Sequence, residues 1–467
     1  MYTDRPQYHF CRRSAPYFRE QQLHMSIFTR VRDATEWRVV RRTISPGPGP
    51  SPETKRRRIK QVRISLAKVL ISFLVLAMAL PVSGETITID NTSGTPTIAK
   101  ALLYAGDNGT VVLRPGIYFE NSIVLENSAT ITADKSAGYG AEDTIIDAEQ
   151  SGRIFDAAGY SLSIDNLTFR NGKADHGGAI YLDSGTLSVT SSVFANCSAD
   201  YGGAIFSDTD STVTVISSAF TNCSAINSGG AILSGFNSTV TVVSSAFTNC
   251  SAVNTGGAIY IFSGTLNTTS TAFFSCSASS YSGGAIYSSS FSPVTITSSS
   301  FTGCSSPCRG GAICSYKGGS MHFCRIYNCS LEAPAVYSHN NFDASENWWG
   351  TNTDPSGFSE GSVRYDPWLV LGVATSSVTV ATGETSVIRA NLTHDVNGID
   401  TSGNGLLPDG IPVTFDLAAG LGNLSVTGGE IAGGANGTIF TAAGSGLVTV
   451  TAKADGQTVG TFTMVTS

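Results

Sequence analysis

One tetrapeptide, repeated at a nearly constant interval, constrains the fold of this chain more than any other feature. Gly-Gly-Ala-Ile occurs six times, and the successive spacings are 25, 27, 27, 27 and 27 residues. The first glycines of the six copies are Gly177, Gly202, Gly229, Gly256, Gly283 and Gly310. A fixed period of this length indicates an architecture in which one supersecondary unit stacks on the next.

A second motif, Phe-x-x-Cys, recurs with the same period as Gly-Gly-Ala-Ile. Its aromatic residues are Phe194, Phe220, Phe247, Phe273 and Phe301. Between the two motifs apolar residues alternate with polar ones, as at Val213/Val215 and Val240/Val242, which indicates a half-buried strand. Each repeat is therefore expected to hold about three short strands: the alternating pair, the Phe-x-x-Cys stretch and the Ala-Ile-Tyr stretch.

A single repeat cannot bury its own apolar face, so neighbouring repeats must stack. Stacking at about 4.8 Å per coil places like residues above like, so that columns of Phe and Val fill the interior. The paired glycines mark a corner where the backbone needs a positive φ or a close approach. The sequence thus predicts an all-β chain built around a parallel β-helix, with the Phe and Gly positions as its structural ladder.

The sequence on either side of the repeat sets the predicted domain boundaries. Residues 96–105 predict a short amphipathic helix that covers the first coil, because an open strand edge needs a cap. Residues 85–350, ending at Asn347-Trp348-Trp349-Gly350, are assigned to the β-helix with this cap. Residues 351–366 are assigned to a polar linker. In residues 367–467, alternating strands with Gly-rich turns predict an immunoglobulin-like β-sandwich.

The N-terminal part has a different character. Residues 1–64 carry a net charge of +10, against −18 for residues 85–467. A 14-residue apolar run from Val69 to Val82 follows two basic residues, which is the layout of a secretory signal, whereas a membrane span needs about 20 apolar residues. We expect residues 65–84 to be a signal peptide that leaves no membrane span in the mature chain. Residues 1–64 are expected to be a disordered basic extension, or a segment upstream of the true start.

The distribution of acid–base residues distinguishes a binding protein from an enzyme, because polysaccharide lyases and hydrolases also adopt the parallel β-helix fold. From Ser211 to Cys308, over 98 residues, there is no Asp, Glu, Lys, Arg or His. Such enzymes need clustered carboxylates or a basic residue. We assign the carboxylates, arginines and histidine on either side to solvated turns and the linker, chiefly Asp134, Glu142, Asp143, Asp147, Glu149, Arg153, Asp156, Asp165, Arg170, Asp175, His176, Asp343, Glu346, Asp354 and Asp366. No catalytic, cofactor-binding or metal-binding residue is predicted.

Most of the ten cysteines occur once per coil at a fixed place. Parallel stacking gives a poor Cβ direction for a disulfide, so those from Cys197 to Cys276 are expected to be reduced and buried. A bridge within the crowded last group is left open; that group is Cys304, Cys308, Cys314, Cys324 and Cys329. Asn-x-Ser/Thr sequons fit glycosylation of an exported surface, although chance explains any single one in a chain this rich in these residues.

In its Gly-Gly-Ala-Ile and Phe-x-x-Cys motifs the chain resembles the polymorphic outer membrane protein repeats, which pair Gly-Gly-Ala-[Ile/Leu/Val] with Phe-x-x-Asn in surface-exposed passenger domains. Here cysteine takes the place of that asparagine, and Asn196, Asn222 and Asn249 lie one residue earlier. The layout is also similar to adhesin-like surface proteins of methanogenic archaea, which join a β-helix to immunoglobulin-like domains through Asn-x-Trp-Trp-Gly. Residues 367–467 resemble an invasin-type immunoglobulin-like module. These resemblances imply a right-handed, single-stranded β-helix.

We therefore expect a secreted or cell-surface, adhesin-like structural or binding protein without catalytic activity or cofactor. It would reside in the cell envelope, and in the outer membrane if the source has one. The expected partners are a host or neighbouring-cell surface, glycans or envelope components, and no nucleic acid. The alternatives are a carbohydrate-active β-helix enzyme of the lyase or hydrolase class, and a module of a larger surface layer. Carboxylates stacked on one open face would favour the enzyme.

Overall fold

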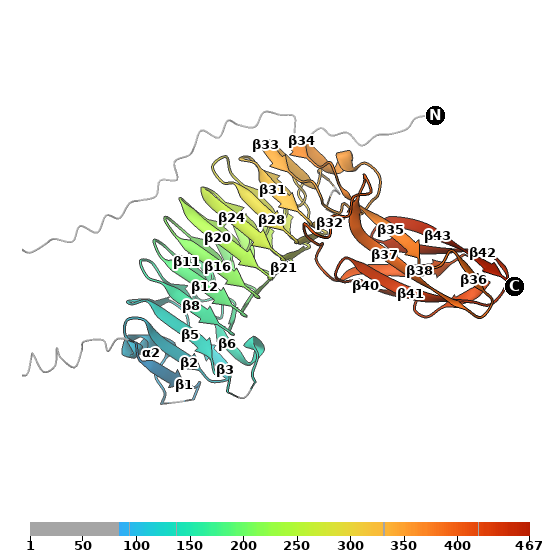
Figure 1. Ribbon diagram of the computed structural model, residues 1–467. Coiled ribbons are helices and arrows are strands. Elements are labelled where there is room, and N and C mark those ends of the chain that lie inside the picture. Colours follow the sequence, from blue (N-terminus) through green and yellow to red (C-terminus); the bar gives the residue numbers. More distant parts are fainter. Residues whose placement is uncertain (1–83, 93, 137, 330–331, 419) are drawn as a thin grey trace, which may run out of the picture. The chain divides into compact units, whose positions relative to one another are not determined.

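The structure is a computed structural model that describes residues 84–92, 94–136, 138–329, 332–418 and 420–467 (Figure 1). The basic extension and all but the last residue of the predicted signal peptide lie outside the described residues. Within the described ranges, no helix has both the length and the apolar character required to cross a membrane. The fold is all-β: a parallel β-helix, here called the solenoid, is followed by a β-sandwich.

Each central coil of the solenoid holds four short strands, one more than expected. In one coil they are β15 (Ile205–Ser207), β16 (Thr212–Ile216), β17 (Ala219–Thr221) and β18 (Ser224–Ser228). The first three are the predicted Ala-Ile, alternating and Phe strands. The fourth follows the buried cysteine, and its polar Ser-Ala sequence carries no apolar alternation that would predict a strand.

Every strand pairs in parallel with its counterpart one coil away, which produces four ladders. The Ile ladder consists of β4 (Ile123–Val124), β7 (Phe155–Asp156), β11 (Ile180–Leu182), β15, β19 (Ile232–Ser234), β23 (Ile259–Ile261), β27 (Ile286–Ser288) and β30 (Ile313–Ser315). The Val ladder consists of β1 (Thr86–Ile89), β2 (Gly109–Leu113), β5 (Ala129–Ala133), β8 (Leu162–Asp165), β12 (Thr186–Thr190), β16, β20 (Ser238–Val243), β24 (Gly264–Thr269), β28 (Val294–Thr297) and β31 (Gly319–His322).

The other two ladders complete each coil. The Phe ladder consists of β3 (Gly116–Phe119), β6 (Thr144–Asp147), β9 (Thr168–Arg170), β13 (Val193–Ala195), β17, β21 (Ala246–Thr248), β25 (Ala272–Phe274), β29 (Ser300–Thr302) and β32 (Arg325–Tyr327). The Ser ladder consists of β10 (Lys173–His176), β14 (Ser198–Tyr201), β18, β22 (Ser251–Ala252) and β26 (Ser277–Ala278). The register keeps like over like, for example Val213 opposite Val240 and Phe220 opposite Phe247.

The predicted cysteine column lies in the solenoid interior. Cys197, Cys223, Cys250 and Cys276 are free thiols with no exposed surface, as expected. The Sγ of Cys250, for example, donates a hydrogen bond to the carbonyl oxygen of Phe220 in the preceding coil, at 3.5 Å. In the last coils Cys304, Cys314, Cys324 and Cys329 are also free thiols, so no bridge joins these four.

Both ends of the solenoid differ from its central coils. The predicted cap is α2 (Ile98–Ala105), which begins after Thr97 and packs its apolar face on β1 and β2. At the other end, β33 (Val336–Asp343) pairs with both β30 and β31 and so joins the Ile and Val ladders. The short helix η2 (Pro355–Phe358) precedes β34 (Ser359–Arg364), which pairs in parallel with β33. The predicted linker, 351–366, is therefore partly wrong: its second half adds one more strand to the solenoid.

The C-terminal domain is a sandwich of two sheets. The four-stranded sheet has the order β35 (Leu369–Thr375), β37 (Thr385–Asp395), β41 (Ala435–Ala442) and β39 (Gly422–Leu424). The five-stranded sheet has the order β36 (Thr379–Ala381), β43 (Gln457–Thr466), β42 (Gly446–Ala454), β38 (Ile411–Leu417) and β40 (Gly428–Ile431). Residues such as Ile388, Phe415 and Phe440 alternate inward and fill the space between the sheets.

The two tryptophans of the Asn-Trp-Trp-Gly motif belong to different cores. Trp349 packs in the solenoid core, whereas Trp348 belongs to the apolar cluster of the sandwich. The indole Nε1 of Trp348 donates to Asp455 Oδ2 at 2.8 Å, and Arg325 Nε donates to the same oxygen at 3.0 Å. Asp455 lies at the β42–β43 turn with its side chain 2% exposed. The motif thus joins the last coils to the sandwich through both tryptophans and one buried ion pair.

Replacing Asp455 by asparagine should lower the free energy of unfolding by about 1–3 kcal/mol, because the mostly buried guanidinium of Arg325 loses its counter-charge. The measurement is urea unfolding followed by tryptophan fluorescence. Asp416→Asn is the matched control, since Asp416 is exposed on β38. Equal stabilities for the two variants would contradict a structural role for the Asp455 carboxylate.

Candidate binding surfaces on the solenoid

The predicted Phe positions form one continuous stack inside the solenoid. Successive ring centroids from Phe194 to Phe301 lie 4.7–5.0 Å apart, and the rings are nearly parallel. All of these rings are fully buried, and the stack is Phe194, Phe220, Phe247, Phe273 and Phe301. Because no ring face reaches the surface, this ladder supports the fold and cannot contact a ligand.

The predicted Gly positions form one corner column. Their φ values lie between +61° and +70°, a region that L side chains rarely adopt, and the column is Gly177, Gly202, Gly229, Gly256, Gly283 and Gly310. A Cβ at Gly256, for example, would also overlap the carbonyl oxygen of Ile259. Two further corners of the coil use Ser and Asn at positive φ, such as Ser217 and Asn222. These corners shape the coil and carry no chemistry.

The main cluster of ionisable groups beside the central coils is centred on Arg153. This arginine forms an ion pair with Asp156 at 2.9 Å, and its guanidinium lies 4.9 Å from the ring centroid of Tyr181. Its Nη2 also donates to the carbonyl oxygen of His176 at 2.9 Å. The hydroxyl of Tyr181 in turn donates to Asp208 Oδ2 at 3.1 Å. The charges on these side chains are therefore used to bind neighbouring coils to one another.

Asp208 is a carboxylate of this cluster with a raised pKa. Burial raises its pKa, the hydrogen bond from Tyr181 lowers it, and nearby Asp183 raises it, with a net increase. The pKa of Tyr181 is also raised, first by burial and then by Asp208. A carboxyl group with a raised pKa is what a general acid requires. This cluster is where a carbohydrate-active function, if the chain had one, would be centred.

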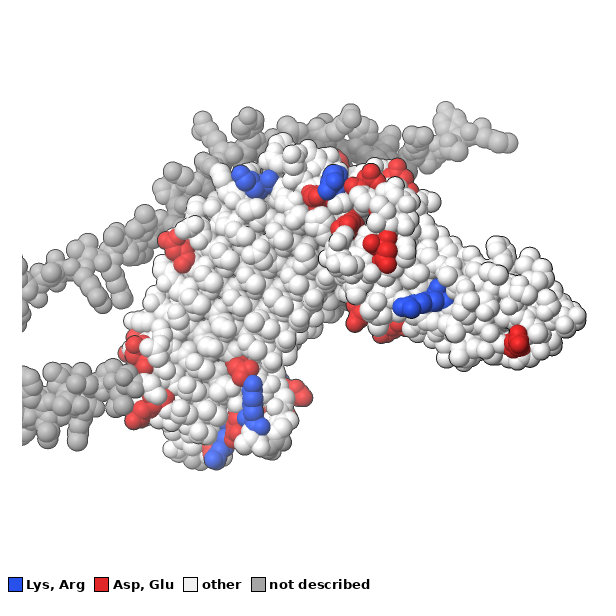
Figure 2. Space-filling view, viewed as in Figure 1, with Lys and Arg blue, Asp and Glu red and all other residues white. Residues whose placement is uncertain are grey.

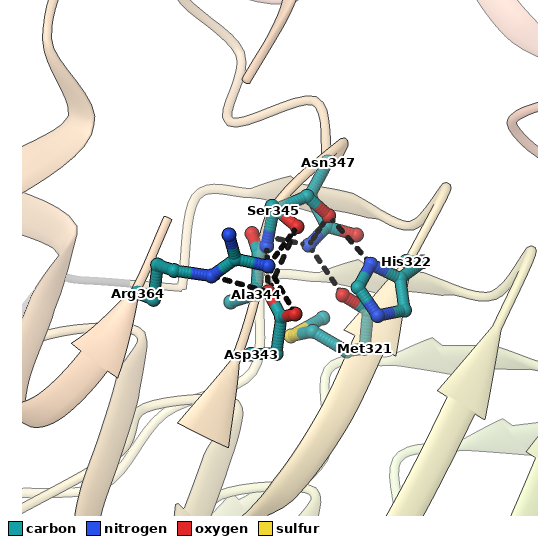
Figure 3. Close-up of polar contacts among 7 residues, drawn as sticks. All are labelled: Met321, His322, Asp343, Ala344, Ser345, Asn347 and Arg364. Atoms are coloured by element: carbon teal, nitrogen blue, oxygen red, sulfur yellow. Dashed lines mark hydrogen bonds and ion pairs between the residues drawn. The ribbon is translucent and has the colours of Figure 1, made fainter. Parts of the chain in front are cut away.

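Polar residues also gather at the C-terminal end of the solenoid (Figure 3). The side-chain amide of Asn347 donates to the carbonyl oxygens of Met321 and Ala344, and its Oδ1 accepts from the Cys324 amide at 2.8 Å. Arg364 pairs with Asp343. Burial raises the pKa of Asp343, but hydrogen bonds from Arg364 and Ser345 outweigh it and lower the pKa. These contacts join the last strands of the solenoid to one another.

A shallow groove of about 400 Å³ runs along the outer face of the Ser ladder. One column of its lining consists of Ser198, Ser224, Ser251 and Ser277, which pair in register from coil to coil. Within the described ranges, these four hydroxyls form no hydrogen bond to protein groups. Ile226 and Val253 lie beside them with 64% and 43% of their surface exposed. Lys173 and Asp200 lie at one end, and the remainder of the lining is uncharged.

Sequence reasoning missed this groove. Its floor is a strand that no apolar pattern predicts, and its polar column consists of serines that look like turn residues. The signal available in the sequence was the Ser-Ala pair that directly follows Cys197, Cys223, Cys250 and Cys276, at the same place in successive repeats. Among the described residues, no group of three or more His, Cys, Asp or Glu side chains is arranged to hold a metal ion.

Comparisons with known proteins give little further information. No family model and no curated protein matches the chain. Among solved structures, it matches the D00-D0 domain of intimin with 17% identity over 23% of this chain and 52% of that one, at a TM-score of 0.18. Domains 4 and 5 of the S-layer protein SbsC match with 19% identity over 22% and 56%, at a TM-score of 0.17. The chain spans about half the length of these structures, and the similarity is too low to carry an argument.

Proposed function

We propose that this chain is an adhesin-like structural and binding protein of the cell surface or the extracellular space, without catalytic activity. The observation that carries the proposal is the groove on the Ser ladder, which combines unpartnered hydroxyls, exposed apolar side chains and no acid–base group beyond its charged end. Away from the end that holds Lys173 and Asp200, such a lining can bind a ligand but offers no group to transfer a proton. The groove suits uncharged glycans of a host or neighbouring cell, or of the envelope.

The finer assignments belong to the same proposal. The repeat is of the polymorphic outer membrane protein type, and export proceeds through the signal peptide at residues 65–84. The solenoid supplies a long lateral surface, as stacked repeats generally do, and the sandwich extends the chain beyond it. Neither nucleic acid nor a cofactor is part of this function.

Binding of neutral oligosaccharides on a glycan array tests the proposal. The double variant Ile226→Lys/Val253→Lys should lower the affinity of the full chain at least tenfold, because two charges would enter a groove that makes no use of charge. The matched control is Val387→Lys/Ile439→Lys, at exposed apolar positions that pair across β37 and β41 in the sandwich. Equal binding by both variants, or no binding by the unaltered chain, would contradict the groove as the site.

The enzyme alternative has its own outcome in this experiment. Conversion of any polysaccharide by the full chain, lost in Asp208→Asn, would replace the binding proposal with a catalytic one centred on the Arg153–Asp208 cluster. Retention of the same product yield in Asp208→Asn would exclude that cluster as the origin of the activity.

A further inference from the structure

The outward face of the Val ladder carries a two-dimensional array of threonine side chains. In β12, β16, β20, β24 and β28, alternate residues point inward, so 14 positions from Thr186 to Thr297 face outward. Ten of the 14 are threonine, namely Thr186, Thr190, Thr212, Thr214, Thr239, Thr241, Thr265, Thr269, Thr295 and Thr297. The other four are Ser188, Ile216, Val243 and Asn267. We call these 14 residues the Thr face.

The array is regular in both directions. Along the solenoid the residues pair in register from coil to coil, for example Thr214 with Thr241, so like positions repeat at about 4.8 Å. Along each strand the outward residues repeat at about 6.6 Å, twice the rise of a parallel strand. Since β-branched side chains are stiff at χ1 and sit on a stacked backbone, their methyl and hydroxyl groups are held in place before any ligand binds.

Strand propensity alone does not explain this face. Threonine favours any exposed strand, so it should be equally common on the outer side of the neighbouring Phe ladder. In the same coils that side has Thr at only three of ten positions, namely Thr221, Thr248 and Thr302, and alanine is more frequent. The concentration of threonine is thus specific to one face of the solenoid.

The hydroxyls of the Thr face are available to a ligand. Thr269 and Thr297 hydrogen-bond to each other at 3.0 Å, while the other eight threonine hydroxyls have no protein partner in the described part of the chain. All 14 side chains are uncharged, and Figure 2 shows the middle of this side of the solenoid without a Lys, Arg, Asp or Glu. The ligand must therefore be recognised by hydrogen bonds and apolar contact and not by charge.

We propose that the Thr face binds ice. A dissolved linear polymer would contact only one column of threonines. A ligand that matches the array in both directions, along the solenoid and along each strand, must be an ordered solid. Hydroxyls at regular intervals can take the place of water molecules in a crystal surface, and the methyl groups between them favour ordered water. Charged groups would impose their own hydration geometry, and none is present among the 14 positions. A solid polysaccharide would be expected to stack on aromatic rings, and the 14 positions include no aromatic residue.

The proposal goes beyond the cell-surface role and does not depend on it, because it concerns a different face from the groove. The measurement is thermal hysteresis, together with the partition of the full chain into a slowly growing ice crystal. The unaltered chain should show hysteresis and enter the ice. Thr214→Tyr/Thr241→Tyr, which places two bulky side chains at the centre of the array, should lower the hysteresis at least tenfold.

The matched control is Thr221→Tyr/Thr248→Tyr, which makes the same change in the same two coils on the outer face of the Phe ladder. It should retain the hysteresis of the unaltered chain, and circular dichroism would verify that both variants keep the fold. Absence of hysteresis and of ice partition in the unaltered chain would overturn the proposal, as would equal losses in the two variants. Binding to insoluble cellulose or chitin that is lost only in the Thr214/Thr241 variant would reassign the face to a solid polysaccharide.

Discussion

Replacing Gly257 by alanine is expected to destabilise the central coils by more than about 4 kcal/mol, although the change adds only one methyl group. Gly257 is the second glycine of its repeat. A Cβ at this position would overlap the carbonyl oxygens of Gly284 and Ser277, which both belong to the next coil. Both oxygens are backbone atoms that cannot rotate away as a side chain could, so the methyl group can be accommodated only by separating two coils. The hydrogen bonds and apolar columns on both sides of the corner would then be lost together.

Urea unfolding followed by far-UV circular dichroism measures this effect. Because the stability of stacked repeats is a sum over nearest neighbours, separation at one coil should also split the transition in two. Gly403→Ala is the matched control: Gly403 is exposed in a sandwich loop, and no atom lies within 4 Å of the place that a Cβ would occupy there. A free energy of unfolding for Gly257→Ala within about 1 kcal/mol of that of the control would refute this account, because ordinary glycine effects are about 0.5–1 kcal/mol.

The repeat made the solenoid predictable because its inward residues obey a simple rule. Stacked coils place identical residues in contact, so Phe220 and Val213 each report the environment of a whole column. The positive φ of Gly202 was predictable for the same reason, because paired glycines at a fixed place in every repeat indicate a corner of the coil. The fourth strand of each coil did not follow, because Ser224 and Ala225 have neither apolar alternation nor strong strand propensity and pair only because their neighbours hold them in register.

Contacts between distant segments were not predictable for a different reason. The partner of Arg325 is Asp455, 130 residues later, and no local pattern relates the two. The strand β34 was likewise hidden, because its pairing with β33 depends on tertiary packing and not on its polar sequence. The candidate surfaces share this limitation: the groove and the Thr face exist only once the coils are stacked.

Raising the pH from 8 to 10 should destabilise the solenoid by about 4 kcal/mol through two cysteines alone. Burial raises the pKa of Cys314 and of Cys324 to about 12. In the unfolded chain a thiol titrates near 8.5. A group whose pKa is raised by folding contributes stability that is complete below the unfolded value. That contribution is lost as the pH rises toward the folded value, at about 1.4 kcal/mol per pH unit for each thiol. The loss therefore falls between about pH 8.5 and 12.

The dependence on pH separates this effect from simple packing. The variant Cys314→Ala/Cys324→Ala loses contacts at every pH, so it should be less stable than the unaltered chain at pH 7. Its free energy of unfolding should nevertheless fall by about 4 kcal/mol less between pH 8 and 10, because the two groups that titrate on unfolding are gone. Urea unfolding under anaerobic conditions with a reductant gives both quantities and prevents oxidation of exposed thiols. Parallel curves for the two proteins across this range would show that these thiols ionise as readily in the folded chain as in the unfolded one, which their complete burial should forbid.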